Sequence, residues 1–515
     1  MKSTFTLKEI TKVFLLTMFL LIASIKTFAY GFTIDGIYYY VLSEENHECE
    51  VTGYKEITNS DLIIPATVTD DKNTKYTVTR INWLAFDGCS GLTSVSIPKS
   101  VTFIGAGAFR DCSSLTSINI PESVTNIRTE TFRDCENLKS VNIPKSLTCI
   151  EEWAFAGSGL QSVEITEGIT TIKEGAFKNC RSLKYISLPN SLTTIGEIRD
   201  ADGVFEGCES LQAITIPSKV SQIVRNTFCD CSSLVSVLLP DDLSAIKSNA
   251  FKGCSSLASV LLPNNLSVIE QGAFYGCNAL KSIVMPPNVK EIESAFYGSN
   301  LENIKIEFGM TKVPDYAFCG CQSLKNIEIP HSVTSIGNYA FRRCYSLTSI
   351  KIPSSVTSVC DSTFEETLTA LNIETSKCLR VMPQLKSQII EITFSKDYEE
   401  TDVTHWDEWT KLEYLTSLSE TPPMIGDSFS RFQKWNLRVM VPTSALETYK
   451  NTPVWKEFFF LKGGAETTDI ENIKQDTVEA NTTRNLPTYN LNGMKVYNTK
   501  PGHVYIRGGK KFVAK

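Results

Sequence analysis

The sequence has few of the residues on which most enzyme and metal sites depend. Its 515 residues include only four histidines, which are scattered along the chain: His47, His331, His405 and His503. No His-Glu-x-x-His, Gly-x-Ser-x-Gly or Gly-x-x-x-x-Gly-Lys-Ser/Thr motif occurs. The sequence therefore predicts a protein that is not an enzyme and that uses neither a metal nor a cofactor.

Long apolar runs are also scarce, and the only marked one lies at the N-terminus. Residues 13–25 are largely apolar and follow three lysines, and Thr27-Phe28-Ala29 places small residues where signal peptidase cuts. The run is too short to span a bilayer comfortably. We expect residues 1–29 to be a signal peptide, with an uncleaved N-terminal anchor as the alternative, and we expect no transmembrane anchor after cleavage.

The chain lacks an excess of basic residues. Its formal net charge is −7, and residues 1–29 carry four lysines and one glutamate, so the remaining chain is near −10 (−7 − 3). Nucleic acids are bound by basic surfaces, which makes them poor partners for this chain. A protein or a carbohydrate is the expected partner.

Phenylalanine recurs along most of the chain at a nearly constant interval. The intervals are 22 or 23 residues, with a single one of 28. These residues are Phe86, Phe109, Phe132, Phe155, Phe177, Phe205, Phe228, Phe251, Phe274, Phe296, Phe318, Phe341 and Phe364. One unit has too few apolar residues for a core of its own, so the units are expected to stack into a solenoid.

Each unit contains a short strand pattern that ends at proline. In the unit of Phe109, Ile118 and Ile120 alternate with polar residues, and Pro121 follows. Period-two alternation predicts a strand with one buried face, and proline ends it because it has no N–H to donate. A second extended stretch follows, and Ala108 to Cys112 is expected to form one helical turn. Strands of successive units are expected to pair in parallel.

These units resemble the BspA-like class of leucine-rich repeats, which read roughly AF-x-x-C-x-x-L-x-x-I-x-I-P-x-x-V-x-x-I-G. The resemblance covers roughly residues 31 to 463, from a segment like the family's N-terminal cap to one like its closing cap at 441–455. It implies a mainly β solenoid, a leucine-rich-repeat arc with a parallel concave sheet and short helical turns. It also implies a secreted or cell-surface protein, outer-membrane associated or free, that acts in adhesion to host or bacterial surface components.

The domain organisation follows from the repeats. We expect a signal peptide at 1–29, an N-terminal cap and first repeat at 30–80, the repeat array at 81–374, and the end of the repeats with a cap at 375–463. A polar linker at 464–485 and a small β module at 486–515 follow. In bacteria that carry such repeats, small C-terminal β modules direct secretion or surface attachment. An inert end cap is the alternative.

Ten of the sixteen cysteines occupy one repeat position. A disulfide framework is one reading, since exported proteins meet an oxidising environment. The other reading, which we favour, is a column of small buried thiols, because serine or threonine replaces cysteine at Ser158, Ser299 and Thr367.

The chemistry of residues 405–409 (His-Trp-Asp-Glu-Trp) leaves two readings as well: a carbohydrate-processing site, or tryptophans that cover the end of the array.

A candidate binding surface lies on the solvent side of the predicted sheet. In the outward column of strand residues, most members are polar, but three consecutive ones are apolar: Leu238, Leu261 and Val284. Contiguous exposed apolar patches mark interaction sites. The full set of candidate ligand-binding residues is Val235, Leu238, Leu261, Val284, Lys305, Lys351 and Tyr185. The sequence thus predicts an exported protein that presents a surface for protein–protein interaction, with a structural role in the cell envelope, without a specific ligand, as the alternative.

Overall fold

The computed structural model describes residues 31–55, 60–197, 202–292, 294–360, 362–364, 368–373, 383–396 and 405–465, together with four short strands between 488 and 513. The predicted signal peptide lies outside the described residues, as does most of the predicted linker. The chain divides into two compact units, Met1–Ser158 and Gly159–Lys515.

The first unit begins with a sheet that covers the start of its repeats. β1, β2 and β3 pair in antiparallel fashion, and β3 pairs with β6 in parallel, which sets the direction of the coils that follow. The strands of this sheet are β1 (Gly31–Ile34), β2 (Ile37–Ser43), β3 (Glu48–Tyr54), β5 (Thr67–Thr69), β6 (Lys75–Ile81) and β8 (Phe103–Ile104).

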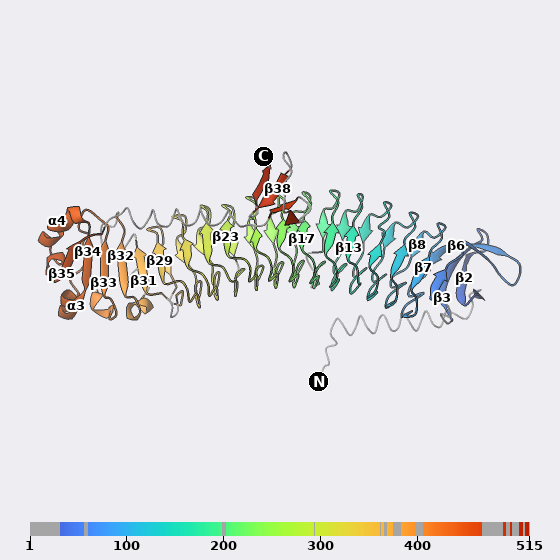
Figure 1. The fold of residues 1–515 in the computed structure, drawn as a ribbon, viewed down its shortest axis with the longest axis horizontal. Coiled ribbons are helices and arrows are strands. Elements are labelled where there is room, and N and C mark those ends of the chain that lie inside the picture. The colour runs from blue at the N-terminus through green and yellow to red at the C-terminus, as the bar shows by residue number, and fades with distance from the viewer. Residues whose placement is uncertain are drawn as a thin grey trace, which may run out of the picture. The chain divides into compact units, whose positions relative to one another are not determined.

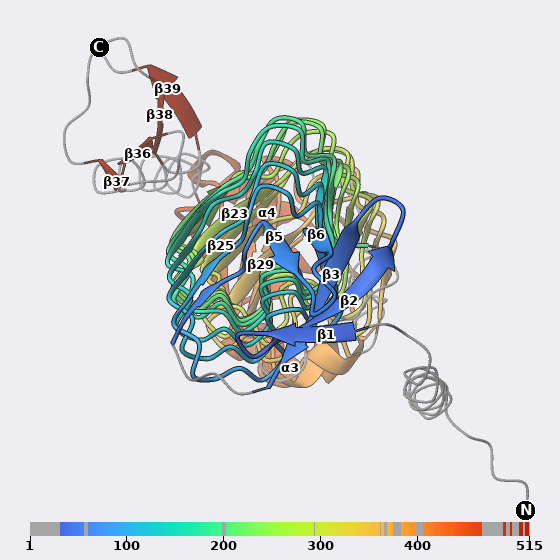
Figure 2. The ribbon, with the colours of Figure 1, turned by 90° about the vertical axis from the view of Figure 1, so that its right-hand side faces the viewer.

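Every repeat forms one coil with three walls (Figures 1 and 2). In the coil of Phe109, residues 105–112 form the turn wall, β9 (Ser117–Asn119) belongs to the long-strand wall and β10 (Asn126–Ile127) to the short-strand wall. Pro121 follows β9 and starts a turn in which Val124 N donates to Pro121 O at 3.0 Å. Proline therefore ends the long strand and turns the chain toward the short one, as predicted.

Strands of successive coils pair in parallel, in register, within each unit. In the first unit the long-strand wall contains β4 (Asp61–Ile63), β7 (Ser94–Ser96), β9 and β11 (Ser140–Val141), and the short-strand wall contains β10 and β12 (Cys149–Ile150). In the second unit the long-strand wall contains β13 (Ser162–Glu164), β15 (Tyr185–Ser187), β17 (Ala213–Thr215), β19 (Ser236–Leu238), β21 (Ser259–Val260), β23 (Ser282–Met285), β25 (Asn303–Ile306), β27 (Asn326–Glu328), β29 (Ser349–Ile352) and β31 (Ala370–Ile373). Its short-strand wall contains β14 (Thr171–Ile172), β16 (Thr194–Ile195), β18 (Gln222–Ile223), β20 (Ala245–Ile246), β22 (Val268–Ile269), β24 (Glu291–Ile292), β26 (Lys312–Val313), β28 (Ser335–Ile336) and β30 (Ser358–Val359).

The repeated phenylalanines form the centre of the core. All thirteen are buried, with at most 1% of the side chain exposed. Within each unit, successive rings stack nearly parallel with centroids 5.3–6.1 Å apart. The predicted solenoid of stacked repeats is confirmed, and within each compact unit the core is a column of aromatic and aliphatic side chains.

The helical turn predicted for the turn wall is wrong. Arg110 N donates to Gly107 O and Cys112 N to Phe109 O, which are turn bonds over three residues. Asp111 has a φ of 57°, a left-handed conformation that no α-helix contains. Instead, Phe109 N and Asp111 N donate to carbonyls of the next coil at 3.0 and 2.9 Å. The turn wall is thus paired between coils as the strands are, and the described residues of the array contain no helix.

The five extra residues of the 28-residue interval leave the stack intact. They fall between Gly196 and Gly203, where residues 198–201 lie outside the described part of the chain. Phe177 and Phe205 on either side still stack at 5.8 Å. The insertion is therefore confined to one corner of the coil.

In the second unit, the array is followed by four more parallel strands and a cap. β31 is followed in the sheet by β32 (Glu391–Phe394), β33 (Tyr414–Ser417), β34 (Arg438–Val441) and β35 (Phe460–Gly463). The helical elements of this region are η1 (Pro383–Ser387), η2 (Trp406–Glu408), α3 (Arg431–Asn436), η3 (Thr443–Ala445), α4 (Leu446–Asn451) and η4 (Trp455–Glu457). The C-terminal module is an antiparallel sheet of β36 (Thr488–Asn490), β37 (Lys495–Val496), β38 (Val504–Arg507) and β39 (Lys510–Val513).

Candidate binding surfaces

The three apolar residues predicted to face solvent lie on the outer side of the long-strand wall. Leu261 is 46% exposed and Val284 52%, while Leu238 is half-buried. Their inward neighbours Val237 and Ile283 are buried. We call Leu238, Leu261 and Val284 the apolar stripe.

The apolar stripe is widened at its start by a second pair of residues. Ala258 N donates to Val235 O at 3.2 Å, so Val235 and Ala258 lie side by side on neighbouring coils. Both side chains are half-buried. They directly precede β19 and β21, and Leu238 and Leu261 each follow three residues further along the chain.

The apolar stripe is bordered by charged residues on the following strands. Val284 pairs with Lys305 in the next strand, and Lys305 pairs with Glu328. Glu328 therefore stands between Lys305 and Lys351, and Lys305 Nζ also lies 3.0 Å from Glu307 Oε1. The border alternates in sign and is not uniformly basic, which suits a partner with both charges at its rim.

Tyr185 lies at the margin of this surface. It is 40% exposed on β15, and its hydroxyl donates to Gln212 Oε1 at 2.9 Å. β17 separates β15 from β19, the strand of Leu238. The structure therefore brings the stripe residues together and leaves Tyr185 two strands away from them.

The column of cysteines is internal. The Cys112 thiol donates to Phe86 O at 3.2 Å, and the Cys135 thiol donates to Phe109 O at 3.1 Å, so each thiol bonds to the preceding coil. Burial raises the pKa of Cys135 and of Cys321 to about 12, which keeps both thiols protonated. The described cysteines all carry free thiols. In this state they act as small core residues with a hydrogen-bond donor, not as nucleophiles or ligands.

The tryptophans of residues 405–409 cover the end of the core. Trp406 and Trp409 are fully buried, and Trp406 stacks on Phe429 at 4.8 Å. Neither ring is available to a sugar. Across the described residues, no three His, Cys, Asp or Glu side chains gather as a metal site would require.

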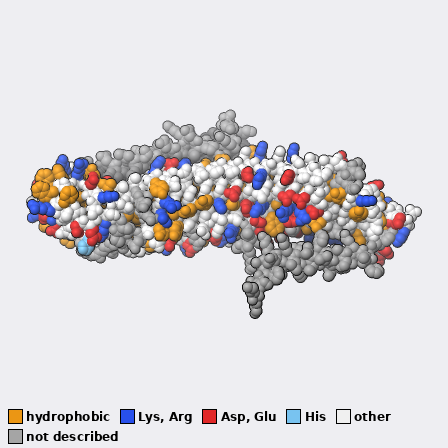
Figure 3. Space-filling view, turned by 90° about the horizontal axis from the view of Figure 1, so that it is seen from below, with side chains coloured by type: hydrophobic (Ala, Val, Ile, Leu, Met, Phe, Trp, Pro, Cys, Tyr) orange, Lys and Arg blue, Asp and Glu red, His pale blue; other side chains and the backbone are white. Residues whose placement is uncertain are grey.

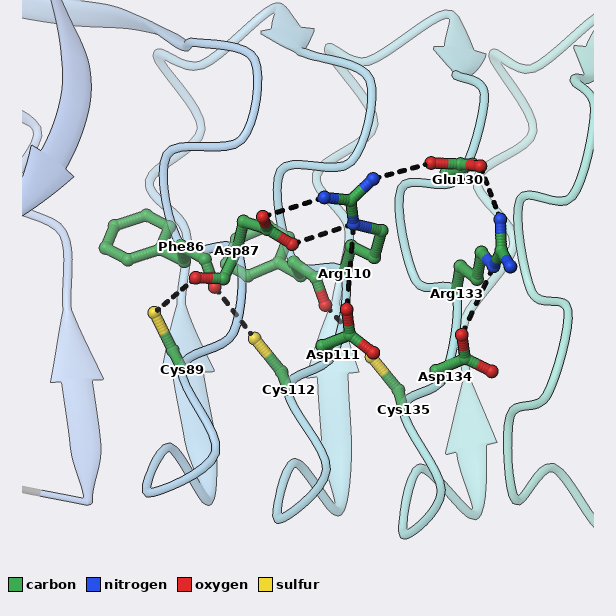
Figure 4. Close-up of polar contacts among 11 residues, drawn as sticks. Phe86, Asp87, Cys89, Arg110, Asp111, Cys112, Glu130, Arg133, Asp134 and Cys135 are labelled. Carbon is green, nitrogen blue, oxygen red and sulfur yellow. Dashed lines mark hydrogen bonds and ion pairs between the residues drawn. The ribbon is translucent and has the colours of Figure 1, made fainter. Parts of the chain in front are cut away.

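A charged network crosses three coils on the turn wall of the first unit (Figure 4). Arg110 donates to both carboxylate oxygens of Asp87 at 2.8 Å and to Glu130 at 3.0 Å, and Arg133 donates to Glu130 at 2.6 Å. Burial raises the pKa of Asp111, which lies 3.7 Å from Arg110. Arg110 bonds to carboxylates of the coils on both sides of its own, while Arg133 holds Glu130 within a single coil, so the network stabilises the stack.

The cap exposes a second apolar cluster that the sequence analysis missed. Phe432, Trp435 and Phe459 are 76%, 58% and 69% exposed, and Trp435 stacks on Phe459 at 5.9 Å. Hydrophobic and basic side chains gather at this end of the second unit, on the left in Figure 3. A shallow hollow against α3 is lined by Arg431, Phe432, Trp435 and Asn436. The spacing of Phe432 and Trp435 is the only sequence signal for it, and it is typical of any amphipathic helix.

Comparison with known proteins identifies the repeat. The BspA-type leucine-rich repeat region matches in six copies, over residues 79–198, 198–325 and 293–407. The chain belongs to the BspA-type leucine-rich-repeat family. This family is related to bacterial cell-surface leucine-rich-repeat proteins and consists in general of non-enzymatic interaction scaffolds.

The chain is also similar to solved structures of bacterial leucine-rich-repeat proteins. A leucine-rich-repeat protein from Bacteroides ovatus is 31% identical, with a TM-score of 0.63 over 76% of this chain and 100% of that one. A leucine-rich cell surface protein from Faecalibacterium prausnitzii is 28% identical over 68% of this chain and 97% of that one, with a TM-score of 0.40. A search of curated proteins finds no similar sequence. No helix among the described residues is long and apolar enough to cross a membrane.

Proposed function

We propose that this BspA-type protein is exported and presents the apolar stripe to a protein partner, in adhesion to host or bacterial surface components. The observation that carries the proposal is the exposure of Leu261 and Val284 on a strand wall whose other outward residues are mostly polar. Such residues add nothing to the core, and a contiguous apolar patch on a rigid sheet is typical of an interaction site.

The rigidity of the long-strand wall supports the same function. β17, β19 and β21 pair in register, and Val237, Leu239 and Leu262, which alternate with the stripe, are buried in the core. A partner that docks on this wall meets a surface whose backbone is already ordered. Binding then costs little conformational entropy, which favours affinity.

The test uses adhesion of beads that carry the mature protein to fixed host cells and to fixed bacterial cells. The double variant Leu238→Ser/Leu261→Ser is expected to reduce adhesion about tenfold, because buried aliphatic contacts at the centre of an interface are worth 1–2 kcal/mol or more. Ile63→Ser is the matched control. Ile63 is 73% exposed in β4 of the first unit, where it pairs with Ser96, so the chemical change is the same at a site outside the stripe.

The melting temperature separates binding from folding. The double variant is expected to melt within a few degrees of the parent protein, because about half of the Leu261 side chain is already in solvent. Unchanged adhesion by a folded double variant refutes the proposal. Export is tested separately by N-terminal sequencing of the secreted protein, which is expected to begin at Tyr30.

A further inference from the structure

A second group of exposed aromatic residues lies on the turn wall of the second unit. Tyr275 and Tyr297 directly follow the core residues Phe274 and Phe296, while Tyr316 and Tyr339 precede Phe318 and Phe341 by two positions. Tyr275, Tyr297 and Tyr316 are 42%, 38% and 41% exposed, and Tyr339 is half-buried. We call these four tyrosines the tyrosine strip.

The strip occupies two positions of the repeat, two residues before the core phenylalanine and one residue after it, and a turn joins the two. In this turn Tyr275 N donates to Gly272 O at 2.9 Å, and Arg342 N donates to Tyr339 O at 3.1 Å. Tyr275 stacks on Tyr297 with centroids 5.9 Å apart, and Tyr316 on Tyr339 at 5.0 Å. The strip therefore consists of two stacked pairs of rings, on four successive coils of the turn wall.

Glycine in the neighbouring coil lets these rings lie along the wall. A Cβ at Gly298 would be 3.3 Å from Tyr275 Cε2, so the Tyr275 ring lies across Gly298. Gly320 meets the Tyr297 ring in the same way, at 4.0 Å. Each of these two rings therefore lies over the glycine of the next coil, and the two rings stack on each other.

Two members of the strip occupy a strained backbone position. Tyr316 has a φ of 60° and Tyr339 a φ of 55°. Positive φ is a feature of this position throughout the repeats, where it also occurs in Leu84, Glu130, Trp153, Asn226 and Asn249. Asparagine and glycine tolerate the left-handed region, whereas a bulky residue costs about 1 kcal/mol there.

Cations stand at both ends of the strip. Lys252 Nζ lies 6.0 Å from the centroid of the Tyr275 ring, and Arg342 Cζ lies 5.0 Å from that of Tyr339. Arg343 beside it is exposed. No acidic residue occupies either strip position in the coils from Phe251 to Phe341. The surface is aromatic in the middle and positive at its ends.

The backbone under the strip is already paired, which decides between classes of ligand. Gly253 N donates to Tyr275 O at 2.8 Å, Phe274 N to Ala295 O at 2.9 Å, and Tyr316 N to Asn338 O at 2.9 Å. An extended peptide cannot add to this wall by strand pairing. The phenolic hydroxyls of Tyr275, Tyr297 and Tyr316 make no hydrogen bond to any other described residue, so they remain available to a ligand that presents many hydroxyls.

We propose that the tyrosine strip binds a linear glycan that carries carboxylate groups, such as a uronic-acid polymer. Pyranose rings present C–H faces to aromatic rings, and the step between stacked tyrosines matches the length of one sugar unit in an extended chain. The phenolic hydroxyls donate to or accept from sugar hydroxyls. Lys252 and Arg342 pair with carboxylates at either end of the bound segment. This site is on a different wall from the apolar stripe and does not depend on it.

The experiment measures binding of the mature protein to immobilised hexasaccharides. The acidic probes are hyaluronan, heparosan, alginate and galacturonan hexasaccharides, and cellohexaose is the neutral probe. At least one acidic probe is expected to bind, and Tyr275→Ala/Tyr297→Ala is expected to weaken its binding about tenfold or more. Lys252→Gln/Arg342→Gln is expected to remove the preference for acidic over neutral probes. A high salt concentration is expected to remove this preference in the parent protein as well, because salt screens the charges.

The controls separate the strip from general surface effects. Phe308→Ala removes a ring that is 71% exposed in the same region but outside the turn wall, and it is expected to leave binding unchanged. Tyr316→Asn/Tyr339→Asn is expected to weaken binding while it maintains or raises the melting temperature, because asparagine fits the left-handed position. Leu238→Ser/Leu261→Ser is expected to retain glycan binding.

Three results overturn the proposal. These are no binding to any acidic hexasaccharide, equal binding by the parent and the tyrosine variants, and binding of polyglutamate at the strip with the same affinity as the best glycan. If the apolar-stripe variants fail to reduce cell adhesion, the proposed function is refuted, but the glycan-binding result at the tyrosine strip is not affected.

Discussion

The buried thiols make the stability of this protein depend on pH in a way that one substitution can isolate. Cys321 donates from its thiol to Phe296 O at 3.3 Å and lies 3.4 Å from the hydroxyl of Ser299, the ladder residue of the preceding coil. Burial raises its pKa from 9.0 to about 12. The folded protein therefore keeps this proton at pH values where the unfolded chain has lost it.

The sign and the size of the effect follow from proton linkage. A raised pKa in the folded state gives a stabilising contribution that is complete below pH 9 and is lost as the pH rises toward 12. Between pH 8 and pH 10, a thiol with an unfolded pKa of 9.0 costs the folded state about 1.4 kcal/mol. In Cys321→Ser this group is absent. The free energy of unfolding of the variant, relative to the parent, is therefore expected to rise by about 1.4 kcal/mol over that range.

The assay is urea denaturation followed by far-UV circular dichroism at pH 8, 9 and 10. Serine fits this column, since Ser158 and Ser299 already occupy it with 2% exposure, so the variant is expected to fold. Ser299→Ala is the matched control, because it changes the same column without adding or removing a thiol. The difference in free energy of unfolding between Ser299→Ala and the parent is expected to be the same at every pH. A constant difference between the parent and Cys321→Ser would refute the claim that burial holds this thiol protonated.

Three further perturbations test the architecture by denaturation. Phe228→Ala is expected to cost about 3–5 kcal/mol because the ring is fully buried between two others, and a loss as small as that of the exposed Phe432→Ala would contradict the stacked core. Gly203→Ala is expected to cost about 1–3 kcal/mol, since its Cβ would lie 1.8 Å from Asn226 O; an unchanged melting temperature would show that the coils are not in close contact there. Arg110→Ala is expected to cost about 1 kcal/mol at low salt and less at 0.5 M salt, and an effect that salt does not alter would show that lost packing, not charge, is responsible.

The sequence predicts the repeat and the strand walls because both depend on patterns within a single coil. Phe109 signals a buried ring, Ile118 a half-buried strand and Pro121 the end of a strand, and none of these signals depends on another part of the chain. The turn wall was mispredicted because Phe109 and Cys112 are three residues apart, a spacing that helices also use. The residue before each ladder cysteine, such as Asp111 or Gly253, has positive φ and breaks the helix. Glycine, asparagine and aspartate recur there in the sequence, and that recurrence is the signal that was missed.

The binding surfaces divide in the same way. The apolar stripe is visible in the sequence because period-two alternation alone tells which side of a strand faces solvent. The tyrosine strip is not visible, because its two pairs occupy different positions of their repeats and only the structure shows that both positions are exposed on the turn wall. The cluster of Trp435 and Phe459 likewise depends on a contact between α3 and the residue that directly precedes β35.

The corner between Gly196 and Gly203 shows where this scaffold accepts new material. Five residues are added there, yet Cys208 still donates to Phe177 O at 3.1 Å, the bond that the other ladder cysteines make. The length of the chain at this corner does not affect the pairing of the walls, so residues can be inserted there without disturbing the neighbouring coils. The same corner recurs in every repeat, and it offers evolution, or a protein engineer, a series of equivalent sites for grafting recognition loops.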